Sequence, residues 1–129
     1  MDNKAFSIIF EEAVSEMRRL GAIKGGEYAV DSDRLHNFKN NAEQNGLHPL
    51  QVWAVYAGKH MDAIRTYIRD VAAGKVRPRS ESIEGRAHDA ALYMILFIAL
   101  VRELDGKGDA ASAMVGHLIW EESHKDCSQ

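Results

Sequence analysis

Apolar residues recur three and four positions apart along most of the chain, which is the spacing of one face of an α-helix. Over residues 4–20 this stripe is well defined and stops at Gly21, so we expect a helix that ends there. Residues 21–32 are polar and rich in glycine, which predicts a loop. A short helix over residues 33–45 should follow, with only a thin apolar stripe. The stripe of the first helix consists of Phe6, Ile9, Phe10, Ala13, Val14, Met17 and Leu20.

The second half of the chain predicts three more helices. Pro49 suits the first turn of a helix that we expect over residues 49–73, before Gly74 and Pro78. The next helix should begin near Ser80, whose hydroxyl can cap it, and should end before residues 106–108. A last helix is predicted over residues 109–123. Because no stretch alternates like a half-buried strand, we expect an all-α protein.

Residues 90–101 carry no charged side chain. A helix that is apolar on every side needs cover on every side, so this one should run through a bundle or across an oligomer interface. Its length, about 18 Å, is well short of a hydrocarbon core of about 30 Å, so we expect no membrane span. The predicted fold is an all-α four-helix bundle with an irregular insert and an extra C-terminal helix. Five helices in 129 residues give little cover, which favours a homo-oligomer, a dimer or tetramer.

The length of 129 residues fits a single domain. We expect it to consist of an N-terminal helix (1–20), a core (21–104) and a C-terminal helix and tail (105–129). Sixteen basic and nineteen acidic side chains give a net charge of −3, which provides no strong signal for nucleic acid or an anionic membrane. One cysteine permits neither an internal disulfide nor a multi-thiolate metal site. Glu11 and Glu12 interrupt the apolar N-terminal segment, so we expect no secretion signal and a cytoplasmic location.

Ionisable residues precede the uncharged segment. Helical spacing places Glu81, Glu84 and His88 on one face, while Asp89 begins a neighbouring apolar stripe. His60 lies within the apolar stripe of the preceding helix. If the two helices pack antiparallel, residues near 60 approach residues near 88, since both are similarly distant from the connecting turn. This arrangement predicts a polar pocket.

Each of these residues also has an ordinary structural interpretation. His60 could be a hydrogen-bonded histidine of the core, as a lone histidine on an apolar face usually is. Glu81 and Glu84 could be first-turn acids that favour the helix dipole. Asp89 is harder to explain in this way, because a carboxylate beside a buried segment requires a partner.

A second polar cluster spans residues 25–41. It could be merely solvated, or it could bind an anionic ligand that carries a base, since carboxylates bind metal, Arg and Lys bind phosphate, and aromatic rings stack. It lacks the glycine motifs of phosphate loops and dinucleotide folds, and zinc is poorly supported, so Mg²⁺ or Mn²⁺ would be the metal. Its candidate ligand-binding residues are Glu27, Tyr28, Asp31, Asp33, Arg34, Asn37, Phe38 and Lys39.

Three segments together resemble a known group. They are KGGEYAVDSDRLHNFK (24–39), VWAVYAGKHMDAI (52–64) and ESIEGRAHDAALY (81–93). They resemble small phage and prophage proteins of uncharacterised function, which look like relatives of the nucleotide-modification-associated domain family. That family is in turn similar to the all-α nucleoside-triphosphate pyrophosphatases of the MazG and dimeric dUTPase type. The resemblance covers residues 20–104 and implies a helical bundle that is commonly oligomeric.

The resemblance also implies a metal site, because the pyrophosphatases bind Mg²⁺ with E-x-x-E on one helix and E-x-x-D on the next. The second motif falls on residues 86–89, where Asp89 matches but Arg86 replaces the glutamate. The first falls near Lys59 to Asp62, where only Asp62 is acidic. Because basic side chains replace some of the family's glutamates, they could bind phosphates directly, and the remaining acids would bind one Mg²⁺ ion. The candidate metal ligands are Asp89, Glu84, Glu81 and Asp62, with Glu27 or Asp31 as further possibilities.

Two functions follow from the resemblance and the residues, with a structural or protein-interaction module as a further alternative. The first is a phage-derived nucleotide-binding or accessory protein without chemistry. The second is a Mg²⁺-dependent nucleoside-triphosphate pyrophosphohydrolase, in which water attacks between the α- and β-phosphates. In the enzyme, Asp89 and Glu84 would hold the metal, Arg34 and Lys59 would stabilise phosphate charge, and Tyr28 or Phe38 would stack on the base. The candidate catalytic residues are Asp89, Glu84, Lys59 and His60, and Arg86 and His88 join the candidate ligand-binding set.

Overall fold

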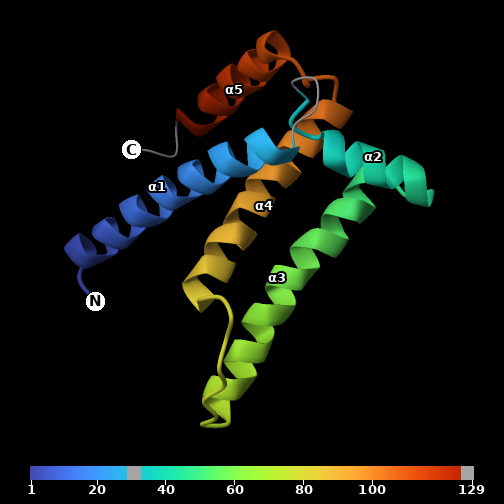
Figure 1. The fold of residues 1–129 in the computed structure, drawn as a ribbon. Coiled ribbons are helices and arrows are strands. Elements are labelled where there is room, and N and C mark those ends of the chain that lie inside the picture. The colour runs from blue at the N-terminus through green and yellow to red at the C-terminus, as the bar shows by residue number, and fades with distance from the viewer. Residues whose placement is uncertain (29–32, 126–129) are drawn as a thin grey trace.

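The structure is a computed structural model that describes residues 1–28 and 33–125, with side chains described except at 24–28, 110–113, 115 and 116. The described residues form helices and no strand, which confirms the all-α prediction (Figure 1). None of the described helices is long and apolar enough to cross a bilayer. The helices are α1 (Asn3–Tyr28), α2 (His36–Asn45), α3 (Pro49–Ala72), α4 (Ile83–Leu104) and α5 (Ala110–His124).

Helix α1 does not end at Gly21, and this part of the prediction was wrong. The helix continues to Tyr28 and takes up most of the expected loop. An isolated glycine costs a helix only about 1 kcal/mol relative to alanine, which packing can offset. A Cβ on Gly21 would lie 3.7 Å from Leu92 of α4 and 3.6 Å from Arg34, which is ordinary van der Waals contact, so the packing at this position does not itself require glycine. The guanidinium of Arg34 also donates to the Gly21 carbonyl oxygen.

Helix α2 begins three residues later than expected. Asp33 precedes it, and its carboxylate accepts a hydrogen bond from the Leu35 backbone N–H at 3.0 Å. The helix ends at Gly46, which adopts a left-handed conformation with φ of 64°. An L-residue rarely adopts this conformation, so glycine is the natural residue for this C-cap.

The boundaries of α3 agree with the prediction, and His48 caps it. The His48 ring accepts from the Leu50 N–H, while the Gln51 side chain accepts from the His48 N–H, a reciprocal capping box. Helix α4 begins later than predicted, because Ser82 and not Ser80 is its N-cap. The Ser82 hydroxyl accepts from the Gly85 N–H at 2.9 Å, which satisfies a backbone donor of the first turn.

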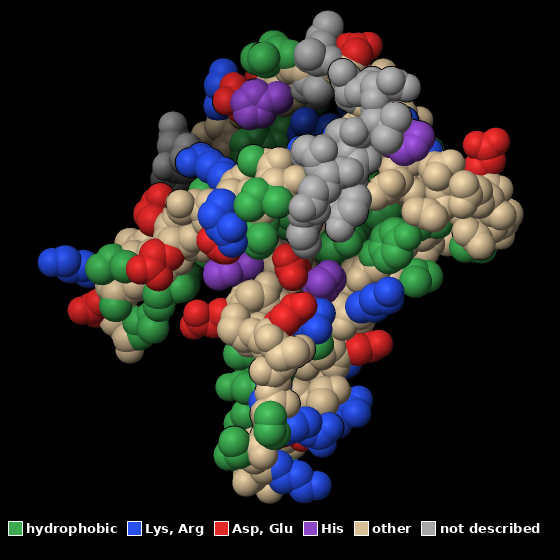
Figure 2. All heavy atoms as spheres, viewed as in Figure 1, with side chains coloured by type: hydrophobic (Ala, Val, Ile, Leu, Met, Phe, Trp, Pro, Cys, Tyr) green, Lys and Arg blue, Asp and Glu red, His purple; other side chains and the backbone are tan. Residues whose placement is uncertain are grey.

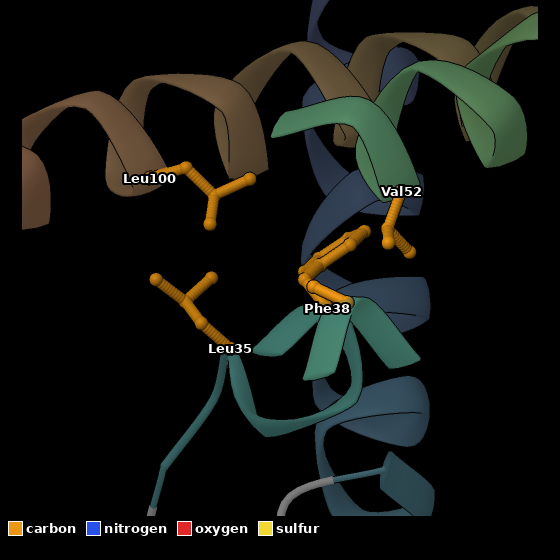
Figure 3. Packing of buried hydrophobic residues seen from close by; sticks show 5 residues of the cluster. Leu35, Phe38, Val52 and Leu100 are labelled. Carbon is orange, nitrogen blue, oxygen red and sulfur yellow. The ribbon is translucent and has the colours of Figure 1, made fainter. Parts of the chain in front are cut away.

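Helices α3 and α4 lie side by side and antiparallel, and the other elements are arranged around this pair (Figure 1). Helix α2 packs on α3, and α1 crosses α4. The core lies where α2, α3 and α4 meet, and Figure 3 shows Leu35 and Leu100 pointing toward each other beside Phe38 and Val52. The Trp53 indole N–H donates to the Tyr93 carbonyl oxygen at 2.7 Å and so joins α3 to α4.

The uncharged helix is not enclosed within a single chain. Leu92 and Leu100 are buried in α4, but Met94, Ile95 and Ile98 on its other side are about half exposed. We expected α4 to be enclosed at the centre of a bundle, but within one chain it is only partly enclosed. One side of α4 packs on α3 and α1, and the opposite side has no cover from the described residues of its own chain.

Candidate functional site

A cavity of about 360 Å³ lies between α2, α3 and α4, next to the core. Helix α2 and the residues before it form one wall, and the facing sides of α3 and α4 form the other. The antiparallel pairing of α3 and α4 brings together segments that are about 30 residues apart in the chain. The residues that line the cavity are Arg34, Asn37, Phe38, Tyr56, Lys59, His60, Arg86, Leu92, Tyr93 and Leu96.

The lining combines positive charge with aromatic rings. Arg34, Lys59 and Arg86 each come from a different part of the wall, and no carboxylate belongs to the described lining. The Lys59 ammonium lies 5.8 Å from the centroid of the Tyr56 ring, within the range of a cation–π contact. Phe38 meets the Tyr93 ring edge-on with centroids 6.4 Å apart. This mixture suits an anionic ligand with a planar, apolar part.

His60 and Asp89 meet at the wall of the cavity. The His60 Nδ1 lies 3.8 Å from an Asp89 carboxylate oxygen, and both side chains are mostly buried. The His60 ring also packs against Tyr93, with centroids 5.2 Å apart. The expectation that residues near 60 approach residues near 88 is thus confirmed. The distance is that of a close ionic contact and exceeds a direct hydrogen bond.

The other acids proposed as metal ligands lie elsewhere. Glu84 is exposed in the first turn of α4 and does not line the cavity. Glu81 precedes the helix, and its carboxylate pairs with the Arg86 guanidinium at 3.2 Å. Asp62 is exposed and pairs with Arg65 at 3.3 Å.

These positions do not fit a magnesium site. Mg²⁺ in proteins is usually held by one or two carboxylates together with water and phosphate oxygens. The described lining contains no carboxylate, and Asp89 lies behind it, in contact with the lining residue His60. Within the described ranges, no group of three His, Cys, Asp or Glu side chains is arranged to hold a metal ion.

Asp33 and Lys39, both predicted to bind a ligand, contact each other, and Lys39 also contacts Glu103 of α4. The Lys39 ammonium lies 2.8 Å from Asp33 and 2.6 Å from Glu103. The hydrogen bonds to Asp33 and then to Glu103 raise the pKa of Lys39, and the hydrogen bond from Lys39 lowers the pKa of Asp33. This ionic link fastens the start of α2 to the end of α4.

His88 lies on the side of α4 that faces α1, and it does not line the cavity. The hydrogen bond from Arg19 lowers the pKa of Glu16 on α1, and the nearby charge of His88 contributes in the same direction. The side chains of Glu27 and Tyr28, and the whole of Asp31, lie outside the described residues. Their predicted roles therefore stay predictions.

Sequence reasoning identified Phe38 but missed the other aromatic and apolar residues of the lining, which are Tyr56, Tyr93, Leu92 and Leu96. Tyr56 and Tyr93 occupy the same helical stripes as core residues, so spacing alone gives them no separate signal. A clue was available, because Tyr56 lies one helical turn before Lys59 and His60, and Tyr93 lies one turn after Asp89. On α3 and on α4 alike, a tyrosine ring therefore lies one helical turn from an ionisable side chain.

A smaller hollow of about 260 Å³ lies at the other end of α3 and α4. Figure 2 shows mainly basic side chains over this end, whereas acidic, basic and histidine side chains gather over the middle of the helix pair. The arginines here are already paired, since Arg77 and Arg79 contact Asp70 and Arg86 contacts Glu81. All three arginines of this hollow thus have a carboxylate partner, and one of them, Arg86, also lines the larger cavity.

No protein-family model, no curated protein and no solved structure matches this chain. We therefore infer the function of this chain from the geometry and charge of the cavity.

Proposed function

We propose that the cavity binds a nucleotide, with its phosphates held by the cations and its base against the aromatic rings, and that the chain is a binding or accessory protein of MazG-like all-α type. The observation that carries this proposal is the composition of the lining, with three cations, three aromatic rings and no carboxylate among the described residues. Arg and Lys bind phosphate oxygens through charge-assisted hydrogen bonds.

The arrangement of the cations supports direct contact with phosphate. Lys59 is exposed at the rim, and Arg34 is held by its hydrogen bond to the Gly21 carbonyl. Arg86 is about a quarter exposed and pairs with Glu81, so its guanidinium is already oriented. A volume of about 360 Å³ falls within the range of small-molecule sites, which is roughly 300–1,000 Å³.

The alternative is a Mg²⁺-dependent pyrophosphohydrolase that converts a nucleoside triphosphate to the monophosphate and pyrophosphate. The contact between His60 and Asp89 favours it, because a histidine beside a carboxylate can accept a proton from water. The scarcity of carboxylates at the cavity counts against it. The binding function therefore has the stronger support.

The oligomeric assembly is part of the same proposal. A four-helix bundle requires cover for both sides of α4, and the described part of one chain covers only one side. We propose that a second chain completes the bundle.

The test is the thermal midpoint of the protein with nucleoside mono-, di- and triphosphates, with and without Mg²⁺. A ligand at a hundred times its Kd should stabilise the protein by about 2.7 kcal/mol. Lys59→Met should weaken binding by about tenfold, or about 1.4 kcal/mol. Arg65→Met is the matched control, because Arg65 is an exposed cation on the same helix that pairs with Asp62 away from the cavity.

Each outcome has a distinct meaning. A shift that Lys59→Met reduces and Arg65→Met leaves unchanged supports binding in this cavity. Release of pyrophosphate in the presence of Mg²⁺ would establish the enzyme instead. No shift with any nucleotide would contradict both and favour a structural or protein-interaction module.

A further inference from the structure

The charge of the cavity limits how many phosphate groups it can neutralise. Arg34, Lys59 and Arg86 supply three positive charges, and no carboxylate belongs to the described lining. Arg86 is not fully available to a ligand, because its guanidinium pairs with the Glu81 carboxylate at 3.2 Å. Three cations and this one paired carboxylate leave two net positive charges for a ligand.

Glu81 reaches Arg86 from outside the cavity. Glu81 precedes α4 and lines the smaller hollow, whereas Arg86 lines both the hollow and the cavity. The Arg86 side chain is only 28% exposed, so water screens this pair less than a pair at the open surface. A phosphate group that approached Arg86 would therefore meet repulsion from the Glu81 carboxylate.

The number of phosphate groups decides whether a nucleotide matches the charge of the cavity. A phosphate monoester carries about 1.5 to 2 negative charges at pH 7, which two net positive charges compensate. A triphosphate has two further phosphate groups, and their negative charge would have no compensation here. Proteins usually offset such charge with Mg²⁺ that carboxylates help to hold, and the described lining contains no carboxylate.

The size of the cavity favours the same kind of ligand. Its volume of about 360 Å³ is near the lower end of the range for small-molecule sites, which is roughly 300–1,000 Å³. One side of the cavity is fixed, because Phe38 belongs to the core and the Tyr93 ring packs against it. A nucleoside with one phosphate group therefore suits the space better than one with a longer phosphate chain.

We propose that the cavity selects a nucleoside monophosphate, bound without a metal ion, and that Glu81 sets this selectivity by pairing with Arg86. This inference rests on the nucleotide binding proposed above and adds the class of nucleotide to it. Glu81 does not line the cavity and acts through Arg86, so it is a positioning residue. Removal of its charge should release Arg86 for a second phosphate group. Glu81 thus controls the preference between nucleotides, and binding itself does not require it.

The first test is calorimetric titration of the wild-type chain. The probes are the common nucleoside monophosphates and their triphosphates, each with excess Mg²⁺ and with EDTA. For the base that binds best, the monophosphate should bind about tenfold more tightly than the triphosphate, because the charge of the triphosphate is not balanced. The Kd of the monophosphate should be the same with Mg²⁺ and with EDTA. A triphosphate that binds as tightly, or a monophosphate that requires Mg²⁺, would overturn the inference.

The second test removes the charge of Glu81. Glu81→Gln should tighten triphosphate binding by about threefold and change monophosphate binding less, so that the ratio of the two Kd values falls. Glu43→Gln is the matched control, because it removes the same charge from an exposed position on α2 that does not line the cavity. An unchanged ratio in Glu81→Gln, or an equal fall in Glu43→Gln, would contradict the role of Glu81.

The selectivity and the binding function fail in different ways. Preferential binding of triphosphates would remove the selectivity and leave nucleotide binding in place. If no probe binds, either by calorimetry or by a shift of the thermal midpoint, nucleotide binding itself is wrong and the selectivity falls with it.

Discussion

Asp70 shows how a single residue fixes the connection between α3 and α4. Its carboxylate is buried at the last turn of α3, where a negative charge is unfavourable for the helix dipole. Arg79 lies 3.0 Å away and also packs over the Tyr67 ring, and Arg77 lies 3.3 Å away. The two guanidinium groups compensate the buried charge and hold the loop against α3.

Loss of Arg79 should therefore cost more stability than loss of Arg77. Arg79 has a side chain that is 28% exposed, against 58% for Arg77, so its contact with Asp70 is less screened by water. We expect Arg79→Met to lower the free energy of unfolding by about 2 kcal/mol, and Arg77→Met by about 0.5 kcal/mol. Urea denaturation of both variants measures the difference, and equal losses would contradict this account.

At the scale of elements, glycines mark both the end and the interior of helices. Gly46 ends α2 with φ of 64°, and Gly58 lies inside α3. At both positions an added Cβ would have no atom within 4 Å, so the backbone conformation alone decides the effect of alanine.

The same substitution should thus have opposite effects at the two positions. Gly46→Ala should destabilise the protein by about 1 kcal/mol, because an L-residue is strained at positive φ. Gly58→Ala should stabilise it by about 0.5–1 kcal/mol, because alanine loses less backbone entropy in a helix. Chemical denaturation tests both, and the same sign of effect at the two positions would be incompatible with this backbone explanation.

The ionic link from Asp33 and Lys39 to Glu103 should make stability depend on pH. The folded state lowers the pKa of Asp33 from its usual 3.8, so its contribution is present above that pH and is lost as the pH falls through the lowered value. The raised pKa of Lys39 acts in the opposite range, and its contribution is lost only above about pH 10.5.

Asp33→Asn should consequently destabilise the protein at neutral pH and have no effect in strong acid. Both side chains of the pair are slightly more than a third exposed, so we expect a loss of only about 0.5–1 kcal/mol at pH 7. Asp62→Asn is the control, since its carboxylate is 78% exposed and pairs only loosely with Arg65. The free energy of unfolding as a function of pH tests the pair, and a loss at pH 7 that persists in strong acid would argue against it.

At the scale of the whole molecule, helical spacing predicted most of the fold. The boundaries of α3 and the approach of His60 to Asp89 followed from periodicity and from counting residues to the turn. The extension of α1 through Gly21 did not, because the contacts that accompany it come from distant parts of the chain: α1 packs on α4, and Arg34 donates to the Gly21 carbonyl oxygen. Likewise, several serines and acids near the start of α4 could cap it, and only the packed loop selects Ser82.

The candidate site was less predictable than the fold. A sequence does not show whether a charged side chain forms an ion pair within the protein or binds a ligand. Lys39 is an example, because its partner Glu103 lies in a distant part of the chain. Tyr56 and Tyr93 were not identified as cavity residues, because the cavity borders the core and both tyrosines lie on the same helical stripes as core residues. Arg34 was identified within the polar segment 25–41, and Lys59 and Arg86 were identified at the positions where the resemblance places the metal motifs.

Phe38 belongs to two structures at once, since it is a buried member of the core and also part of the cavity wall. A change at this residue would disturb the core and the proposed binding cavity together, so natural variation there is constrained by the small stability margin of a single domain. Lys59 and Asn37 border the same space without belonging to the core. If the cavity binds the proposed nucleotide, related chains should differ in ligand preference through exchanges at the polar positions of the rim while the aromatic residues stay unchanged.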